Sequence, residues 1–467
     1  MRPKPLIQFS LCLTVVLGVL SGARVAAVEQ PPGHGRERPN ILVIFADDWG
    51  FGDLGCHGNE VVETPNLDGL AGQGTDFHQF TVASGVCSPS RVALLTGRFP
   101  ARYRITEHFA SVGHHKKTGM PDWMDPNAPM LPRLLKQAGY QTCHFGKWHL
   151  TNYHIPDAPH PAAYGYDRAF IWGGSDHSAN PDEVFDLAID VIKEAGEKPF
   201  FINLWIHETH TPHYPTPEML EHYAGKGLDE RERVYPAVVT NADRQIGRVL
   251  KALDDAGIAG ETLVIFSSDN GPEYTIDRKK KMGHPELGPG LTTWYSLGSS
   301  GGLKGAKRSL HEGGVRVPLI VRWPGKVKAG QVDKSSVITG VDWLPTLCAI
   351  AGAELPEGYN GDGEDRSAVL LGRPGERGRA IYWYWPGGHG GNNWMLAAIR
   401  EGRWKLLVDE SRERIELYDI PADRAETDNL AGARPEVVGD LIAKLEGWLA
   451  QLPEQADPRC FSKLRKK

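Results

Sequence analysis

Three short apolar runs without polar alternation stand out along the chain, at residues 40–46, 200–206 and 262–266. Runs of this kind are typical of strands buried on both faces of a parallel sheet. Helical patterns lie between them, at residues 130–138, 182–195 and 235–256, and an apolar run at 315–323 and a helical pattern near 343–351 follow. Strands alternating with helices predict a layered α/β domain, residues 39–375, with a large mixed, mostly parallel sheet between helices.

The pattern changes after the Gly/Pro-rich residues 372–375. Four strand-like runs and an amphipathic helix follow, at residues 382–385, 396–400, 404–408, 415–418 and 435–452. They predict a smaller α+β domain, residues 376–455, with an antiparallel sheet and a helix. The aromatic residues at 382–385 and Trp394 either stack on sugar rings or belong to the core. Residues 456–467 form a tail, and we expect its basic end, residues 463–467, to be frayed.

The N-terminal residues have the features of a secretory signal peptide. Arg2 and Lys4 precede an apolar run at residues 11–20, and small residues at 25–27 provide a cleavage site. The run is too short to span a bilayer, so we predict a signal peptide at residues 1–27, a disordered leader at 28–38 and no membrane span. The mature protein is therefore expected in the periplasm or outside the cell.

Charge and cysteine content narrow the possible partners. Loss of residues 1–27 removes three basic residues and no acid, which moves the net charge from −6 to −9. An acidic exported protein is a poor candidate for nucleic-acid binding. Five cysteines remain after cleavage, scattered without metal-type spacing, so no disulfide pairing is predicted: Cys56, Cys87, Cys143, Cys348 and Cys460. Because that number is odd, Cys87 is the natural candidate for an unpaired residue.

Cys87 lies in the most informative string of the chain, Cys87-Ser88-Pro89-Ser90-Arg91. Pro89 occupies a position that suits the first turn of a helix, and Gly97 a position at which a helix usually ends. The pattern therefore predicts a short helix at residues 89–96, with Cys87 just before it. The N-terminus of a helix favours an anion or a thiolate, and Arg91 can share that face. Taken alone, a cysteine at a helix start would more often be a buried structural residue.

Acidic residues end two of the predicted strands. Asp47 and Asp48 follow the first strand, and Asp269 and Asn270 follow the third. Ligands collect at the carboxyl ends of strands in open parallel sheets, so these side chains can converge. Carboxylate and amide oxygens suit Ca²⁺ or Mg²⁺, whereas zinc usually recruits His or Cys. A single acidic pair alone would more often be a turn or a helix cap.

Two further sequence motifs contain lysine and histidine side chains. Lys147 and His149 are two residues apart, so on an extended segment they face the same way and could hold an anion and exchange protons; a half-buried strand is the alternative. His207 and His210 follow the second strand at a spacing of three, which does not match the His-Glu-x-x-His metalloprotease pattern.

Together with the glycine-rich basic loop at residues 302–316, these strings resemble, in this order, the type I (formylglycine-dependent) sulfatases of the alkaline phosphatase superfamily. The resemblance is greatest to the arylsulfatase and N-acetylgalactosamine-6-sulfatase groups. It implies an alkaline phosphatase-like fold and a maturation step in which a formylglycine-generating enzyme oxidises Cys87 to formylglycine. It also implies one divalent cation, usually calcium with magnesium possible, and these ligands: Asp47, Asp48, Asp269, Asn270 and residue 87.

The resemblance further implies a reaction. The hydrated aldehyde at position 87 attacks the sulfur of a sulfate ester, forms a covalent sulfo-enzyme intermediate and releases sulfate. Arg91 holds the formylglycine oxygens, Asp269 helps to activate one hydroxyl and His149 deprotonates the other. Lys147, His210 and Lys307 neutralise the sulfuryl group and the leaving alkoxide, and His210 or Lys307 donates the proton. Lys304 is the alternative to Lys307, and His207 has no assignment.

The implied substrate is a sulfated small molecule or oligosaccharide, and no residue specifies the sugar. Two other functions stay open. The chain could hydrolyse phosphomonoesters or phosphonates, because such enzymes of the superfamily share the metal-bearing strand ends. It could also be a non-catalytic sulfoglycan-binding protein in which Cys87 stays a thiol.

Overall fold

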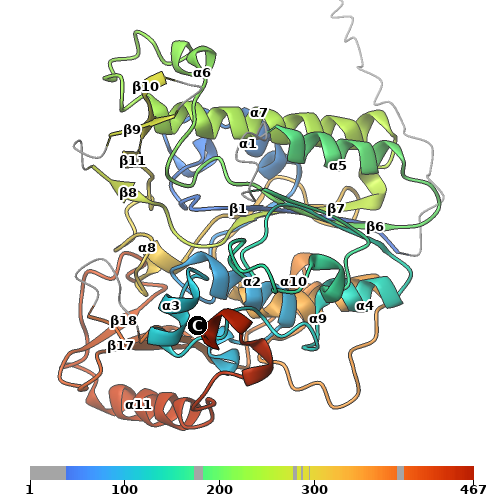
Figure 1. Ribbon diagram of the computed structural model, residues 1–467. Coiled ribbons are helices and arrows are strands. Elements are labelled where there is room, and N and C mark those ends of the chain that lie inside the picture. The colour runs from blue at the N-terminus through green and yellow to red at the C-terminus, as the bar shows by residue number, and fades with distance from the viewer. Residues whose placement is uncertain are drawn as a thin grey trace, which may run out of the picture. The chain divides into compact units, whose positions relative to one another are not determined.

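The computed structural model describes residues 38–172, 182–276, 281–284, 288–293, 295–386 and 394–466. The predicted signal peptide, the leader up to residue 37 and residue 467 lie outside the described residues. Residues 36–467 form one compact unit, shown in Figure 1. Within the described part, no helix has the length and apolar character needed to cross a membrane.

The centre of this unit is a sheet in which the described residues form eight strands, in the order β13-β2-β12-β7-β1-β6-β4-β5. β1 pairs in parallel with β6 and β7, and β12 is antiparallel to both of its neighbours, so the sheet is mixed but mostly parallel. The bounds are β1 Asn40–Ala46, β2 Thr75–Phe77, β4 Gln141–Lys147, β5 Arg168–Trp172, β6 Phe200–Trp205, β7 Thr262–Ser268, β12 Leu319–Arg322 and β13 Gln331–Asp333.

Helices cover both faces of this sheet, as Figure 1 shows. Successive side chains of a strand point to opposite faces, so Leu42 and Ile44 of β1 pack in one apolar cluster while Ile41, Val43 and Phe45 pack in the other. The first face is covered by α1 Pro65–Gln73, α5 Glu183–Lys193 and α7 Val234–Asp255, and the second by α2 Cys87–Thr96, α4 Leu131–Gln137 and α9 Trp343–Ala351. The predicted layered α/β architecture is confirmed.

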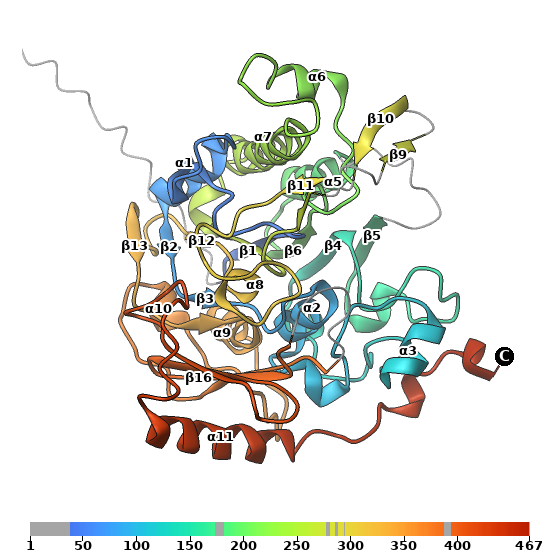
Figure 2. The same cartoon turned by 90° about the vertical axis from the view of Figure 1, so that its left-hand side faces the viewer.

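The C-terminal part adds an antiparallel sheet and a helix. The strands are β15 Ile381–Tyr384, β16 Ala397–Glu401, β17 Trp404–Val408 and β18 Ile415–Asp419, and α11 Pro435–Leu449 packs on β16 and β17 (Figure 2). Tyr382 stacks on Trp448 of α11, and Trp383 and Trp385 are buried, so these aromatic side chains belong to the core. The core runs without a break from α2 into this sheet, and the boundary between residues 375 and 376 stays a prediction.

Two local expectations were wrong. The run at residues 315–323 is a strand only over β12, because Glu312–Val315 forms the short helix α8 and Pro318, which has no N–H to donate into a sheet, directly precedes β12. The basic end is not frayed. Lys463–Lys466 is a 3-10 helix, and the Arg465 guanidinium pairs with the Asp122 carboxylate at 2.5 Å.

Candidate active site

The acidic ends of β1 and β7 lie side by side. β1 and β7 are parallel neighbours with Ala46 opposite Ser268, so the next residues of both strands emerge at the same edge. The Asp48 backbone N–H donates to Asp269 Oδ1 at 3.2 Å, and the Asp269 N–H donates to the Ala46 carbonyl at 3.0 Å. Asp48 has a φ of 63°, a left-handed turn that ends the strand. The structure thus brings the four predicted oxygen donors together, and all four residues are fully buried: Asp47, Asp48, Asp269 and Asn270.

This cluster fits a divalent cation. One carboxylate oxygen from each of Asp47, Asp48 and Asp269 lies within 4.8 Å of the others. Asp47 Oδ1 and Asn270 Oδ1 are buried and accept no hydrogen bond from any described residue. Burial raises the pKa of Asp269 to about 7, with a further contribution from the Asp47 charge, despite the opposing Arg91. Buried acceptors and crowded carboxylates are costly without a positive charge, and a hard cation supplies one.

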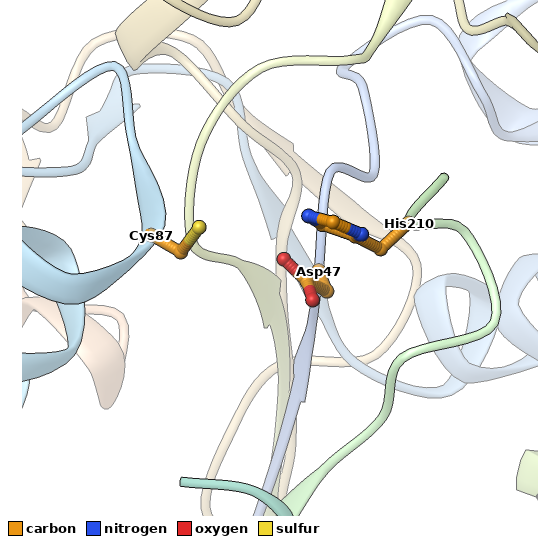
Figure 3. A group of neighbouring side chains, drawn as sticks. All are labelled: Asp47, Cys87 and His210. Carbon is orange, nitrogen blue, oxygen red and sulfur yellow. The ribbon is translucent and has the colours of Figure 1, made fainter. Parts of the chain in front are cut away.

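Cys87 is the first residue of α2, not the residue before the helix. Val86 is the extended N-cap, and Gly97, at a φ of 64°, ends the helix as predicted. Figure 3 shows the side chains of Cys87, Asp47 and His210 pointing toward one another from three different segments, and their ligand atoms lie within 4.8 Å. Burial raises the pKa of Cys87 to about 11, and although Lys147 lowers it, Asp269 and Asp47 add to the rise. The unmodified side chain is therefore a neutral thiol at neutral pH.

Arg91 is the buried cation behind Cys87. Its Nε and Nη2 donate to Asp269 Oδ2 at 3.1 and 2.6 Å, and Nη2 lies 3.7 Å from Asp47 Oδ1. The guanidinium also packs over the Trp205 ring, with a centroid distance of 4.8 Å. Arg91 thus fixes the orientation of Asp269 and offsets part of the negative charge of the cluster.

Two lysines reach the acidic pair from different segments. Lys147, the last residue of β4, donates from Nζ to Asp47 Oδ2 at 2.5 Å. Lys307 donates from Nζ to Asp48 Oδ2 at 2.5 Å. Lys304, the alternative to Lys307, instead donates to the Tyr418 hydroxyl at 2.8 Å. Of these two loop lysines, Lys307 is the one that the structure places at the acidic pair.

His149 lies just beyond β4, and its backbone departs from the expected extended form. Its φ is 52°, because the strand has ended at Lys147 and the chain turns. Nε2 lies 3.0 Å from the Phe109 carbonyl, which can only accept, so Nε2 carries the proton. Burial, together with the charge of Lys147, holds the pKa of His149 well below its usual value. Nδ1 accepts no hydrogen bond from the described residues and is therefore free to take a proton.

The loop after β6 supplies two stacked imidazoles. His207 and His210 have ring centroids 4.6 Å apart at an interplanar angle of 20°. His207 Nδ1 donates to Asp47 Oδ2 at 2.5 Å, and His210 Nε2 lies 3.8 Å from Asp48 Oδ2. His207 is a site residue without an assignment from sequence. The available signal was its position two residues after the end of β6, the strand next to β1.

Glu273 is a second site residue without a sequence assignment. Its carboxylate lies 3.5 Å from Lys307 Nζ and 2.9 Å from Arg308 Nη2. Burial would raise the pKa of Glu273, but the charge of Lys307 and the contacts with Arg308 outweigh it and lower the pKa to about 2. Glu273 therefore stays ionised and holds Lys307 toward the acidic pair.

The mostly parallel sheet lies between helices and carries a buried acidic cluster and facing cations at its carboxyl edge, which is the architecture of the alkaline phosphatase-like class of folds. The family model of the sulfatases matches residues 39–353, and that of the C-terminal part of N-sulphoglucosamine sulphohydrolase matches residues 305–455. The chain therefore belongs to the sulfatase family, whose members hydrolyse sulfuric esters and generally bind a divalent cation.

Individual relatives support this assignment. The chain is 34% identical to N-acetylgalactosamine-6-sulfatase of Sus scrofa, over 86% of this chain and 78% of the relative. It is 28% identical to N-acetylgalactosamine-6-O-sulfatase of Bacteroides thetaiotaomicron, over 90% and 94%. Among solved structures, Ps i-CgsB has a TM-score of 0.74 at 25% identity and covers 92% of this chain and 96% of its own. The chain is thus a sulfuric ester hydrolase with the fold of these sulfatases.

Proposed function

We propose that this sulfatase removes sulfate from a sulfated carbohydrate after export from the cytoplasm. The observation that carries the proposal is the meeting of Cys87, Asp47 and His210 at the carboxyl edge of the sheet (Figure 3). The relatives named for N-acetylgalactosamine-6-sulfate and a structural neighbour bound to a neocarrahexaose favour a sugar. Export follows from the signal peptide predicted at residues 1–27.

The reactive group we propose is formylglycine, formed from Cys87 by a formylglycine-generating enzyme. A hydrated aldehyde supplies one hydroxyl to attack sulfur and a second whose deprotonation expels the sulfate. A serine could accept the sulfuryl group but has no second hydroxyl to release it. The neutral, buried thiol agrees with a residue that is a precursor rather than a thiolate nucleophile.

The cation we propose is Ca²⁺, held by Asp47, Asp48, Asp269, Asn270 and residue 87. It would supply a fixed positive charge for the substrate oxygens in a set of hard oxygen ligands. Asp47 Oδ1 and Asn270 Oδ1 are buried and accept no hydrogen bond from the described residues, which supports a bound cation over a purely structural role.

The remaining roles follow from the charges around the cluster. Lys147 and Lys307 point their ammonium groups at the acidic pair and are placed to neutralise a sulfuryl group bound there. His210 can give a proton to the leaving alkoxide, and His149, through Nδ1, can take the proton that releases sulfate. Arg91 orients Asp269 and the oxygens at position 87.

Mass spectrometry of the peptide spanning residues 81–98, from protein made with a maturation enzyme, tests the proposal most directly. Conversion of the thiol to the aldehyde lowers the peptide mass by about 18 Da, because CHO replaces CH₂SH. The matched control is the same peptide from Cys87→Ala, which cannot change. Matured protein with an intact thiol and no desulfation activity would instead indicate a sulfoglycan-binding protein.

A paired rate measurement separates sulfatase from phosphatase chemistry. Aryl sulfate and aryl phosphate with the same leaving group are compared on the same matured sample, followed by a panel of sulfated glycosaminoglycan and algal oligosaccharides. The sulfate ester is expected to react faster. A faster phosphate ester would favour the phosphomonoesterase alternative.

A further inference from the structure

A second group of metal-ligating side chains lies away from the catalytic cluster, where a turn meets the central sheet. Cys56 and His57 belong to the 3-10 turn Gly55–His57, and Asp76 lies in β2. His78 follows β2 directly and still pairs with the next strand, since its N–H donates to the Asp333 carbonyl at 2.8 Å. Residues 76 and 78 therefore share one side of the extended segment.

One carboxylate oxygen lies between the two imidazoles. Asp76 Oδ2 is 2.8 Å from His57 Nε2 and 3.0 Å from His78 Nε2. The ligand atoms of Cys56, His57 and Asp76 all lie within 4.8 Å of one another. The group thus offers two ring nitrogens, a carboxylate and a thiol at one place, and Cys56 is exposed to solvent.

The hydrogen bonds of His57 fix its tautomer. Its Nδ1 lies 2.6 Å from the Phe51 carbonyl, which can only accept, so Nδ1 must carry a proton. Nε2 faces Asp76 Oδ2 at 2.8 Å as a second N–H donor, and a bound metal would take the place of that proton. An N–H donated to a backbone carbonyl from the far side of the ring is the arrangement usual for metal-binding histidines.

The carboxylate of Asp76 gives a second, independent indication of a bound cation. The residue is only 4% exposed, and its Oδ1 accepts no hydrogen bond from any described residue. A buried carboxylate oxygen without a donor is costly unless a positive charge lies nearby. The two imidazoles contact Oδ2 and leave Oδ1 without a partner. A cation bound by the carboxylate would compensate Oδ1.

We propose that Cys56, His57, Asp76 and His78 form a binding site for a zinc-class cation, separate from the catalytic cation. Nitrogen and sulfur ligands select Zn²⁺ or a similar transition metal, whereas the all-oxygen catalytic cluster selects Ca²⁺ or Mg²⁺. The bound metal would connect the segment that follows β1, through Cys56 and His57, to β2, through Asp76. The inference does not depend on the sulfatase reaction, because it concerns metal binding alone.

The test is a titration of the calcium-loaded full chain with Co²⁺, a spectroscopic substitute for Zn²⁺. The expected result is one Co²⁺ per chain with a thiolate-to-cobalt charge-transfer band in the near ultraviolet. Cys56→Ser should abolish the band, and His78→Gln should weaken Zn²⁺ binding at least about tenfold in competition with a chelating indicator. Melting temperatures of both variants in the absence of added transition metal verify that they fold.

Two matched controls make the result specific. Cys87→Ala removes a thiol that, among the described residues, also lies close to possible metal ligands, and this variant should keep the band. His222→Gln, which removes an exposed histidine paired with Glu63 at 2.8 Å, should keep the Zn²⁺ affinity. A wild-type chain without the band, a band that survives Cys56→Ser, or a band lost in Cys87→Ala would overturn the proposal and leave a simple imidazolium–carboxylate pair.

Discussion

At the scale of single residues, the candidate active site consists of buried side chains that are paired with charged or imidazole partners. Each of the three catalytic-cluster carboxylates has a cationic or imidazole partner at close range: Lys147 and His207 on Asp47, Lys307 on Asp48, and Arg91 on Asp269. In such a site the loss of one partner leaves a buried charge uncompensated, which costs more than the contact itself. Single substitutions here are therefore informative.

Cys87→Ala is expected to reduce sulfate release at least about 10³-fold, because it removes the side chain that we propose as the precursor of the nucleophile. Cys87→Ser should accept one sulfuryl group and then stall, giving at most a single turnover. Initial rates and the stoichiometry of product release measure both effects. Circular dichroism should match the wild type, since the change removes only a sulfur atom or replaces it with oxygen. Sustained turnover by Cys87→Ala would contradict the assigned role.

His207→Gln tests the residue that was not assigned from sequence. Because His207 Nδ1 donates to Asp47 Oδ2, the variant should misorient that carboxylate and lower kcat and calcium affinity by about 10- to 100-fold. Isothermal titration with Ca²⁺ and steady-state kinetics provide the two readouts. His213→Gln is the matched control, because His213 is a buried histidine of the same loop whose ring nitrogens have no hydrogen-bond partner among the described residues. Equal effects of both variants would mean that only loop packing was disturbed.

Some residues of the site could be predicted from the sequence, and others could not. Asp47, Asp48, Asp269 and Asn270 could be predicted to lie together because each pair closely follows an apolar run and the ends of such strands share one edge of a sheet. His207 and Glu273 could not be assigned, because their roles come from contacts with Asp47 and Lys307 across the fold. The roles of these residues in catalysis stay predictions.

At the scale of elements, the mostly apolar strands of the central sheet were predictable, and two of its shorter or more polar strands were not. β1, β6 and β7 are buried along their whole length, and burial on both faces favours apolar residues at most of their positions. β4 contains Thr, Cys, His, Gly and Lys, and β2 has only three residues, so neither shows a strand period. Their strand character comes from pairing with neighbours that lie far away in sequence.

One buried ion network joins β17 to the loop that carries Lys307. Lys405 Nζ lies 2.8 Å from Glu312 in α8 and 3.1 Å from Glu426, and all three side chains are fully buried. Lys405→Met should lower the free energy of unfolding by about 3–5 kcal/mol, because it leaves two buried carboxylates without their shared cation. Lys444→Met on exposed α11 is the control and should cost at most about 1 kcal/mol. Urea unfolding measures both, and equal losses would refute the network.

The same network predicts a pH dependence of stability. Burial raises the pKa of Glu426 to about 7, although Lys405 opposes the rise. The folded state then holds a proton that the unfolded state releases above its ordinary value near 4.5, so stability from this group is complete below about pH 4.5 and is lost as the pH rises through 7. Glu426→Gln should remove this decline, which is at most about 3 kcal/mol. Urea midpoints for both proteins between pH 4.5 and 8 provide the test, and parallel profiles would contradict it.

At the scale of the whole molecule, the active site collects residues from segments spread over most of the catalytic part. The acidic pairs come from β1 and β7, Cys87 and Arg91 from α2, Lys147 from the end of β4, and Lys307 from the loop before α8. Only the packed sheet and helices hold these segments at hydrogen-bonding distance. The cation that we propose would therefore stabilise the assembled fold as well as the reaction, because the unfolded chain has no such cluster.

Removal of the cation is thus expected to lower both activity and stability. Chelation should reduce the rate of sulfate release at least about tenfold, because the cluster loses the charge that faces the substrate. It should also lower the melting temperature, since calcium at 100 times its Kd adds about 2.7 kcal/mol to the folded state. Activity and calorimetric melting are measured before chelation, after it and after Ca²⁺ is restored, with Asp47→Asn as a variant whose melting temperature should respond less to Ca²⁺. Full activity of the metal-free protein, or equal calcium-dependent shifts in the wild type and Asp47→Asn, would show that the acidic cluster is not the cation site.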